Sequence, residues 1–169
     1  CPHREQVIGA FAILEGSIAE MATGEGKTLT ANLSAIVAAW RGMPVHVITA
    51  NDYLAARDCE LGQDLFARCG VTAASITGDT PADARSAGYA HEIVYTTARD
   101  MLADHLRDDL ALSGKIGRVK HALAPARNSG KVDSAGIVMR GVYQVIIDEA
   151  DSVLIDDAVT PLIISSPKP

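Results

Sequence analysis

The residues best suited to chemistry are Gly24-Glu25-Gly26-Lys27-Thr28, where a short apolar segment leads into two glycines and then a helical pattern. Because glycine has no Cβ, a phosphate group can approach the backbone closely at these positions. The N–H groups at the start of a helix carry the partial positive charge that binds an anion. The sequence therefore predicts a phosphate-binding loop, with nucleotide contacts from Thr23, Gly24, Glu25, Gly26, Lys27 and Thr28.

Within this loop, Lys27 is expected to neutralise the β- and γ-phosphates during catalysis, and the Thr28 hydroxyl is expected to coordinate Mg²⁺. The general phosphate-loop pattern has a glycine five residues before Gly26, whereas this chain has Met21 there. The interpretation rests on the strand–turn–helix setting, since anion binding depends on that setting. The alternative is a plain glycine turn before a helix.

Two adjacent carboxylates, Asp148 and Glu149, follow the apolar run Val145-Ile146-Ile147. In open α/β sheets, ligands bind at the carboxyl ends of the strands, which is where these acids are expected. Asp148 is expected to hold Mg²⁺ through water, since that ion prefers oxygen ligands. Glu149 is expected to orient or deprotonate the attacking water. With the loop about 120 residues earlier, both halves of a Mg²⁺-dependent nucleoside triphosphatase site are predicted.

Short β-branched runs alternate with longer helical patterns, which is typical of an α/β fold with a mainly parallel sheet flanked by helices. The predicted strands are 17–21, 45–49, 71–77, 93–96 and 142–147, with a short one at 163–164. The predicted helices are 27–41, 52–69, a short one after Pro81, and 98–109 capped by Thr97. His46, in an apolar strand, is expected to be a neutral core residue. Met101, Leu102 and Leu106 have helical spacing and are also expected in the core.

The span 113–141 departs from this alternation, with six lysines and arginines and a single acid, Asp133. So long a stretch without an element indicates an insertion or a mobile loop. It is either a solvated surface or a contact for an anionic partner such as lipid headgroups, nucleic acid or an acidic polypeptide. Residues 165–169 have the composition of the start of a linker to a further domain.

The composition limits the classes of protein. At 169 residues, with 48% hydrophobic and 21% charged residues, the chain predicts a globular domain. A net charge of −6 argues against non-specific coating of nucleic acid, which needs Lys and Arg to neutralise phosphates. The three cysteines have no zinc-binding spacing and suit a reducing compartment.

Several segments together resemble the SecA preprotein translocase ATPase family. The string from Ile18 to Leu29 is similar to that family, which also has methionine at the position of Met21. The other similar stretches are 51–58, 106–109, 147–156 and 160–165, in the family's order along the chain. The last of these, Thr-Pro-Leu-Ile-Ile-Ser, is more specific than either nucleotide motif, because ordinary helicases do not share it.

The resemblance implies the N-terminal part of a RecA-like P-loop NTPase motor of the helicase superfamily 2 type over 1–169. It implies that Gln6 reads the adenine and that Arg57 lies close to the nucleotide. The implied partners of the full-length protein are a preprotein, the membrane translocation channel and anionic lipid, with a homodimer as one oligomeric state. The implied location is cytoplasmic, with peripheral membrane association.

Some residues depart from the family. Asp148-Glu149-Ala150-Asp151 has the spelling of DEAD-box helicases, and His3-Arg4-Glu5 replaces an aromatic-acidic stretch before Gln6. A divergent SecA-like paralogue, an RNA or DNA helicase motor and a non-catalytic ATP-binding module therefore stay open. Since the family's second motor domain supplies further arginines, the 169 residues alone are expected to bind nucleotide weakly and to hydrolyse it negligibly.

Overall fold

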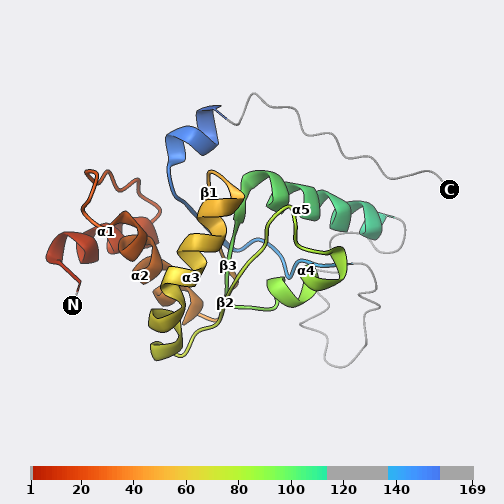
Figure 1. The fold of residues 1–169 in the computed structure, drawn as a ribbon, viewed down its shortest axis with the longest axis horizontal. Coiled ribbons are helices and arrows are strands. Elements are labelled where there is room, and N and C mark those ends of the chain that lie inside the picture. The colour runs from red at the N-terminus through yellow and green to blue at the C-terminus, as the bar shows by residue number, and fades with distance from the viewer. Residues whose placement is uncertain (1, 114–136, 157–169) are drawn as a thin grey trace.

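The computed structural model describes residues 2–113 and 137–156, which form an α/β fold (Figure 1). The sheet has four parallel strands in the order β2-β3-β1-β4. These strands are β1 (Val45–Thr49), β2 (Ala73–Ser75), β3 (Ile93–Thr97) and β4 (Gln144–Ile147). The helices are α1 (Arg4–Leu14), α2 (Lys27–Ala39), α3 (Asp52–Arg68), α4 (Ala82–Tyr89) and α5 (Ala98–Ser113), followed after β4 by a π-helical turn, η1 (Ser152–Asp156).

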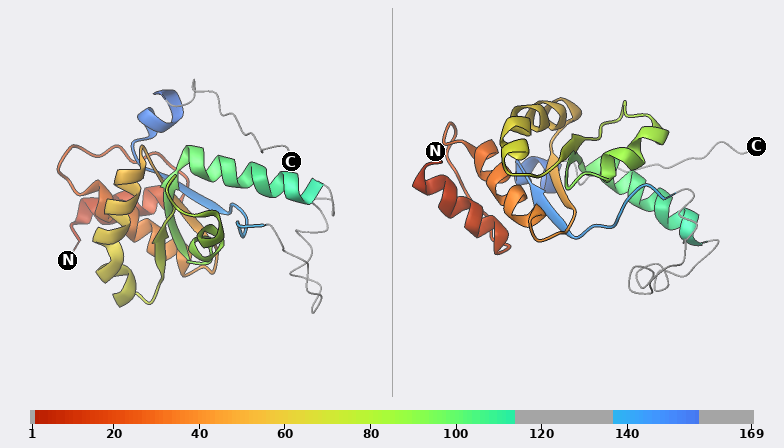
Figure 2. Two further views of the ribbon diagram at one scale, coloured as in Figure 1. Left: turned by 45° about the vertical axis from the view of Figure 1, so that its right-hand side comes forward. Right: turned by 90° about the horizontal axis from the view of Figure 1, so that it is seen from below.

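One face of the sheet is covered by α2 and α3, and α1 packs on the outer side of α2 (Figure 2). Alternate residues of the strands point to this face, including Val45, Val47 and Tyr95. They meet small helix residues such as Ala35 and Ala38, which are fully buried. Because alanine takes little space, the helices lie close to the sheet, and the core needs few aromatic side chains.

The opposite face is covered by α4 and α5. Ile76, Tyr89, Val94 and Met139 form a second, smaller apolar cluster there. The loop before β4 is joined to α5 by Asp108, whose carboxylate accepts hydrogen bonds from the backbone N–H groups of Val138 (2.9 Å) and Met139 (2.8 Å). The two helical layers and the sheet between them confirm the predicted fold class.

Most predicted elements are confirmed, with shifts at their ends. The predicted start of α2 at Lys27 and both bounds of β1 are correct. Thr97 caps α5 as expected, since its Oγ1 accepts a hydrogen bond from the Asp100 N–H at 3.2 Å. The strand predicted at 71–77 is shorter, covering Ala73–Ser75. Helix α1 was not predicted, because its apolar and polar residues do not separate clearly by face.

The prediction of a strand at 17–21 is wrong, because residues 17–22 have no regular secondary structure. Among the described residues, β4 pairs only with β1, and the 17–21 segment lies across a pocket from β4. A strand needs a paired neighbour, and this segment has none in the described sheet. The short run of Ile18, Ala19 and Met21 was therefore not enough to define a strand.

The core prediction for α5 is correct for one residue of three. Met101 packs against the smaller apolar cluster, whereas Leu102 and Leu106 are 46% and 37% exposed. The buried positions on this helix are instead taken by Ala103, Asp104 and Asp108. Most of the 113–141 span, the 163–164 strand and the 165–169 linker lie outside the described residues.

Candidate functional site

The predicted phosphate loop joins the irregular segment before it to the start of α2. Gly24 and Gly26 have φ angles of +89° and +82°, a region that glycine enters without steric cost. Gly26 is the N-cap of α2 and has no side chain to cap it. The first N–H groups of the helix have no partner within the helix, so they are available to an anion.

At the end of β4, Asp148 continues the ladder with β1 through a 2.9 Å hydrogen bond from its N–H to the Ile48 carbonyl. The next residue, Glu149, has a φ of +54°, which is uncommon for a residue with a side chain. Its N–H donates to Asp148 Oδ1 at 3.0 Å, and its carbonyl accepts from the Val153 N–H at 3.1 Å. Strained backbone of this kind is concentrated at functional sites.

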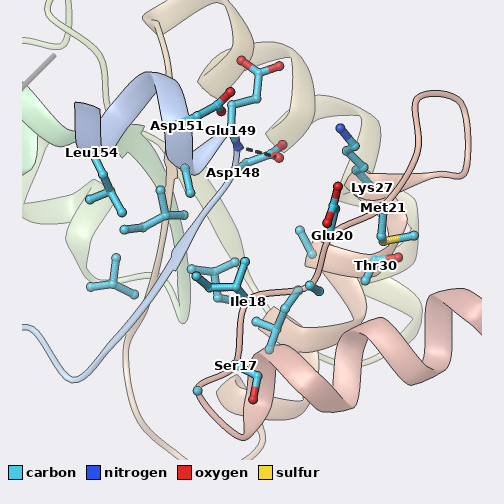
Figure 3. A pocket seen from close by; sticks show the side chains of 18 residues that line it. Ser17, Ile18, Glu20, Met21, Lys27, Thr30, Asp148, Glu149, Asp151 and Leu154 are labelled. Atoms are coloured by element: carbon cyan, nitrogen blue, oxygen red, sulfur yellow. Dashed lines mark hydrogen bonds between the residues drawn. The ribbon is translucent and has the colours of Figure 1, made fainter. Parts of the chain in front are cut away.

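A pocket of about 580 Å³ brings the two motifs together. Lys27, Asp148 and Glu149 all line it, although they come from opposite ends of the sequence. In Figure 3 the Lys27 side chain extends from the start of α2 toward the Asp148 carboxylate on the other wall. The pocket lies at the carboxyl end of β4, where open parallel sheets bind their ligands.

The other predicted site residues do not line this pocket. These are Gln6, Thr23, Gly24, Glu25, Gly26, Thr28 and Arg57. The residues from Thr23 to Thr28 adjoin Lys27 along the chain, and Thr28 is half-buried in the first turn of α2. Residues 23–26 and Thr28 therefore lie near the pocket because they are close to Lys27 in the chain, although their own atoms do not line it.

Gln6 is only 7% exposed, whereas a glutamine is usually a surface residue. Its Nε2 donates to the Glu25 carbonyl at 2.9 Å, and its Oε1 accepts from the His3 N–H at 2.9 Å. The structure therefore places Gln6 directly against the predicted phosphate loop.

Arg57 lies on α3, which starts just after β1. Its guanidinium bonds Asp58, with Nη2 at 2.7 Å from Oδ1. The hydrogen bond and charge of Asp58 raise the pKa of Arg57, and Asp148 adds a smaller attraction in the same direction. Arg57 is therefore within electrostatic reach of the acidic strand end, and its side chain is 43% exposed.

Two acids in the pocket were not predicted as site residues. Glu20 and Asp151 line it together with Asp148 and Glu149, and Lys27 is the one basic side chain among the lining residues. The sequence signal for Glu20 was its place seven residues before Lys27, in the segment leading into the loop. Its position facing the pocket depends on the irregular path of that segment.

The charges of the side chains that line the pocket limit which ligand it can bind. Four carboxylates and one lysine would repel a bare triphosphate, whereas a divalent cation between them would offset the repulsion. Magnesium is typically held by one or two carboxylates together with substrate phosphates. Among the described residues, no group of three or more His, Cys, Asp or Glu side chains is arranged to hold a metal ion. The oxygen donors present fit Mg²⁺ shared with a nucleotide.

The sequence profile of the SecA DEAD-like domain matches residues 1–169. The chain belongs to this family. It is 49% identical to protein translocase subunit SecA 2 of Magnetococcus marinus over 168 residues, covering 99% of this chain and 26% of that protein. Against SecA 2 of Chlorobium chlorochromatii the identity is 46%, covering 98% of the chain and 25% of the relative.

The chain is also similar to SecA proteins that are longer than these two SecA 2 relatives. Protein translocase subunit SecA of Acidithiobacillus ferrooxidans is 44% identical over 162 residues, which cover 96% of this chain and 16% of that protein. The chain thus spans about a quarter, or less, of the length of these relatives. Within the described residues, no helix has the length and apolar character needed to cross a bilayer.

Proposed function

We propose that this chain is the ATP-binding segment of a SecA-type protein translocase motor. The observation that carries the proposal is the pocket lined jointly by Lys27, Asp148 and Glu149. Membership of the SecA DEAD-like family supports it, since the relatives are named protein translocase subunits. ATP hydrolysis in the complete polypeptide would drive an unfolded preprotein across a membrane.

Each residue has a proposed role. Lys27 neutralises charge on the β- and γ-phosphates, while the loop amides from Thr23 to Thr28 bind phosphate oxygens. The Thr28 hydroxyl and Asp148, the latter through water, hold Mg²⁺, which supplies the positive charge that offsets the triphosphate. Glu149 orients the attacking water and accepts its proton. Gln6 reads the adenine, and Arg57 lies close to the nucleotide.

The proposed surroundings follow from the family. The complete protein would bind preprotein and a membrane translocation channel, with anionic lipid as a further contact, and would act in the cytoplasm with peripheral membrane association. A homodimer is compatible with this proposal.

The first test is nucleotide binding by the complete polypeptide that carries this sequence. Lys27→Ala should weaken ATP binding about 10- to 100-fold, as expected for the loss of a charge-assisted contact. Removing Mg²⁺ with a chelator should weaken it as well, because the acidic pocket then repels the triphosphate. Equilibrium titration with a fluorescent ATP analogue measures both effects.

Arg41→Ala is the matched control, because it removes an exposed positive charge in the turn that follows the opposite end of α2. It should leave the affinity unchanged. Equal affinity of the Lys27→Ala variant and the parent protein would exclude the proposed site. ATPase stimulation by unfolded preprotein with membranes supports a translocase, and stimulation by nucleic acid alone would point to a helicase.

A further inference from the structure

The side-chain amide of Gln6 has both ends engaged within the protein. Nε2 donates to the Glu25 carbonyl, 19 residues further along the chain, and Oε1 accepts from the His3 N–H, both at 2.9 Å. The residue lies in the first turn of α1 and is 7% exposed. A buried amide with partners at both ends has a fixed orientation, since rotating it would leave polar atoms unpaired.

The contact with Glu25 fixes the orientation of one peptide of the loop. In a trans peptide the carbonyl and the following N–H point in opposite directions. Because the Glu25 carbonyl points to Gln6, the Gly26 N–H points away from it. The Gly26 carbonyl is fixed as well, since it accepts from the Thr30 N–H at 3.1 Å. The peptides on both sides of Gly26 are therefore held.

The contact with Gln6 adds to the preference for glycine at position 26. A Cβ built on Gly26 would lie 2.3 Å from Gln6 Nε2, so a larger residue there would displace the Gln6 amide from its hydrogen bonds. Gly24, by contrast, has no atom within 4 Å of its built Cβ. The positive φ favours glycine at both positions, but only Gly26 is in close contact with a neighbouring side chain.

Helix α1, which carries Gln6, packs closely against α2 and the segment before the loop. A Cβ on Gly9 would lie 3.0 Å from Thr30 Cγ2 and 3.4 Å from Met21 Sδ, so the helix lies close to both α2 and the segment before the loop. The Ser34 hydroxyl of α2 shares its one proton between the Thr30 carbonyl of its own helix at 2.9 Å and the Ala10 carbonyl of α1 at 3.3 Å. These contacts make α1 a rigid base for Gln6.

We propose that Gln6 is a positioning residue of the phosphate loop, orienting the Glu25–Gly26 peptide so that its N–H is set for phosphate, independently of the base. The proposal rests on the proposed nucleotide function of the same site. The amide keeps one further N–H and further acceptor capacity for an adenine. Recognition of the adenine by Gln6 and orientation of the Glu25–Gly26 peptide by Gln6 can therefore be measured separately.

The experiment compares ATP with inorganic tripolyphosphate, which has no base, in the complete polypeptide with Mg²⁺. Gln6→Met keeps most of the volume but removes both hydrogen bonds. It should raise Kd about three- to tenfold for tripolyphosphate as well as for ATP, as expected for loss of the one hydrogen bond that reaches the loop, the bond to the Glu25 carbonyl. Without ligand, amide hydrogen exchange in the 22–28 segment should become faster in the same variant.

Gln63→Ala is the control, because Gln63 also donates to a backbone carbonyl, that of Ala73, but on α3. It should change neither affinity nor exchange in the loop. A rise in Kd for ATP alone, with loop exchange unchanged, would overturn the proposal and leave Gln6 as a base reader. If the parent protein binds neither ligand and Lys27→Ala makes no difference, the proposed nucleotide function itself fails.

Discussion

At the scale of single residues, His46 is a buried group whose ionisation opposes folding. It is 1% exposed, its ring lies 5.9 Å from that of Tyr89, and its Nδ1 has no hydrogen-bond partner among the described residues. Burial lowers the pKa of His46, and the positive charge of Arg140 lowers it further, against an opposing backbone hydrogen bond at Gln144. The folded chain therefore favours the neutral imidazole, as predicted from the apolar strand.

The pH dependence follows from this shift. Below about pH 6.5 the unfolded chain takes up a proton on His46, whereas the folded chain does so only at lower pH. The free energy of unfolding should therefore fall as the pH falls through this window, by at most about 1.4 kcal/mol per pH unit. Urea denaturation between pH 5 and 8 measures the slope.

In the His46→Gln variant this part of the slope should disappear. His3→Gln, which replaces an exposed histidine before α1, is the control and should keep the slope of the parent chain. An unchanged slope in His46→Gln would show that another group is responsible for the pH dependence.

At the scale of elements, α4 and α5 are joined by a buried ionic network. Arg85 of α4 bonds Asp104 at 2.5 Å and Asp100 at 3.0 Å, and Tyr89 donates to Asp104 at 3.0 Å. Burial by itself lowers the pKa of Arg85, but the hydrogen bonds with Asp104 and Asp100 more than offset this and raise it. The network replaces the apolar contact that the spacing on α5 had predicted.

We expect Arg85→Met to reduce the free energy of unfolding by about 3–5 kcal/mol, because Asp104, 1% exposed, would lose its main buried partner. Arg107→Met is the matched control, since Arg107 also pairs with Asp104, at 2.8 Å, but is 57% exposed. Its loss should cost less than about 1 kcal/mol. Similar urea midpoints for the two variants would contradict the distinction between buried and exposed partners.

At the scale of the whole molecule, the chain spans about a quarter, or less, of the length of its SecA 2 and SecA relatives. Under the proposed function, hydrolysis needs an arginine from another part of the polypeptide, and in P-loop NTPases such an arginine is worth roughly 10³–10⁵ in rate. We predict that the 169 residues alone bind ATP weakly and release phosphate at a negligible rate. Steady-state phosphate release, compared with the complete polypeptide, measures this. Equal turnover that Lys27→Ala abolishes would refute it.

The sequence by itself determined the features that depend on neighbouring residues. Lys27 starts a helix because Gly26, with its positive φ, ends the preceding turn. Val45–Thr49 forms a strand because its apolar, partly β-branched residues suit a position buried on both faces. Asp148 follows directly from such a strand, so its place at the carboxyl end of the sheet was predictable.

Tertiary structure decided what depends on distant residues. The 17–21 segment had the composition of a strand but no neighbour to pair with among the described residues, so it became the wall that brings Glu20 to the pocket. Gln6 is buried and donates to the Glu25 carbonyl in the loop before α2, a contact that the local sequence does not reveal. Backbone conformation is set largely by covalent neighbours, whereas burial, charge balance and shared cavities require contacts that only folding creates.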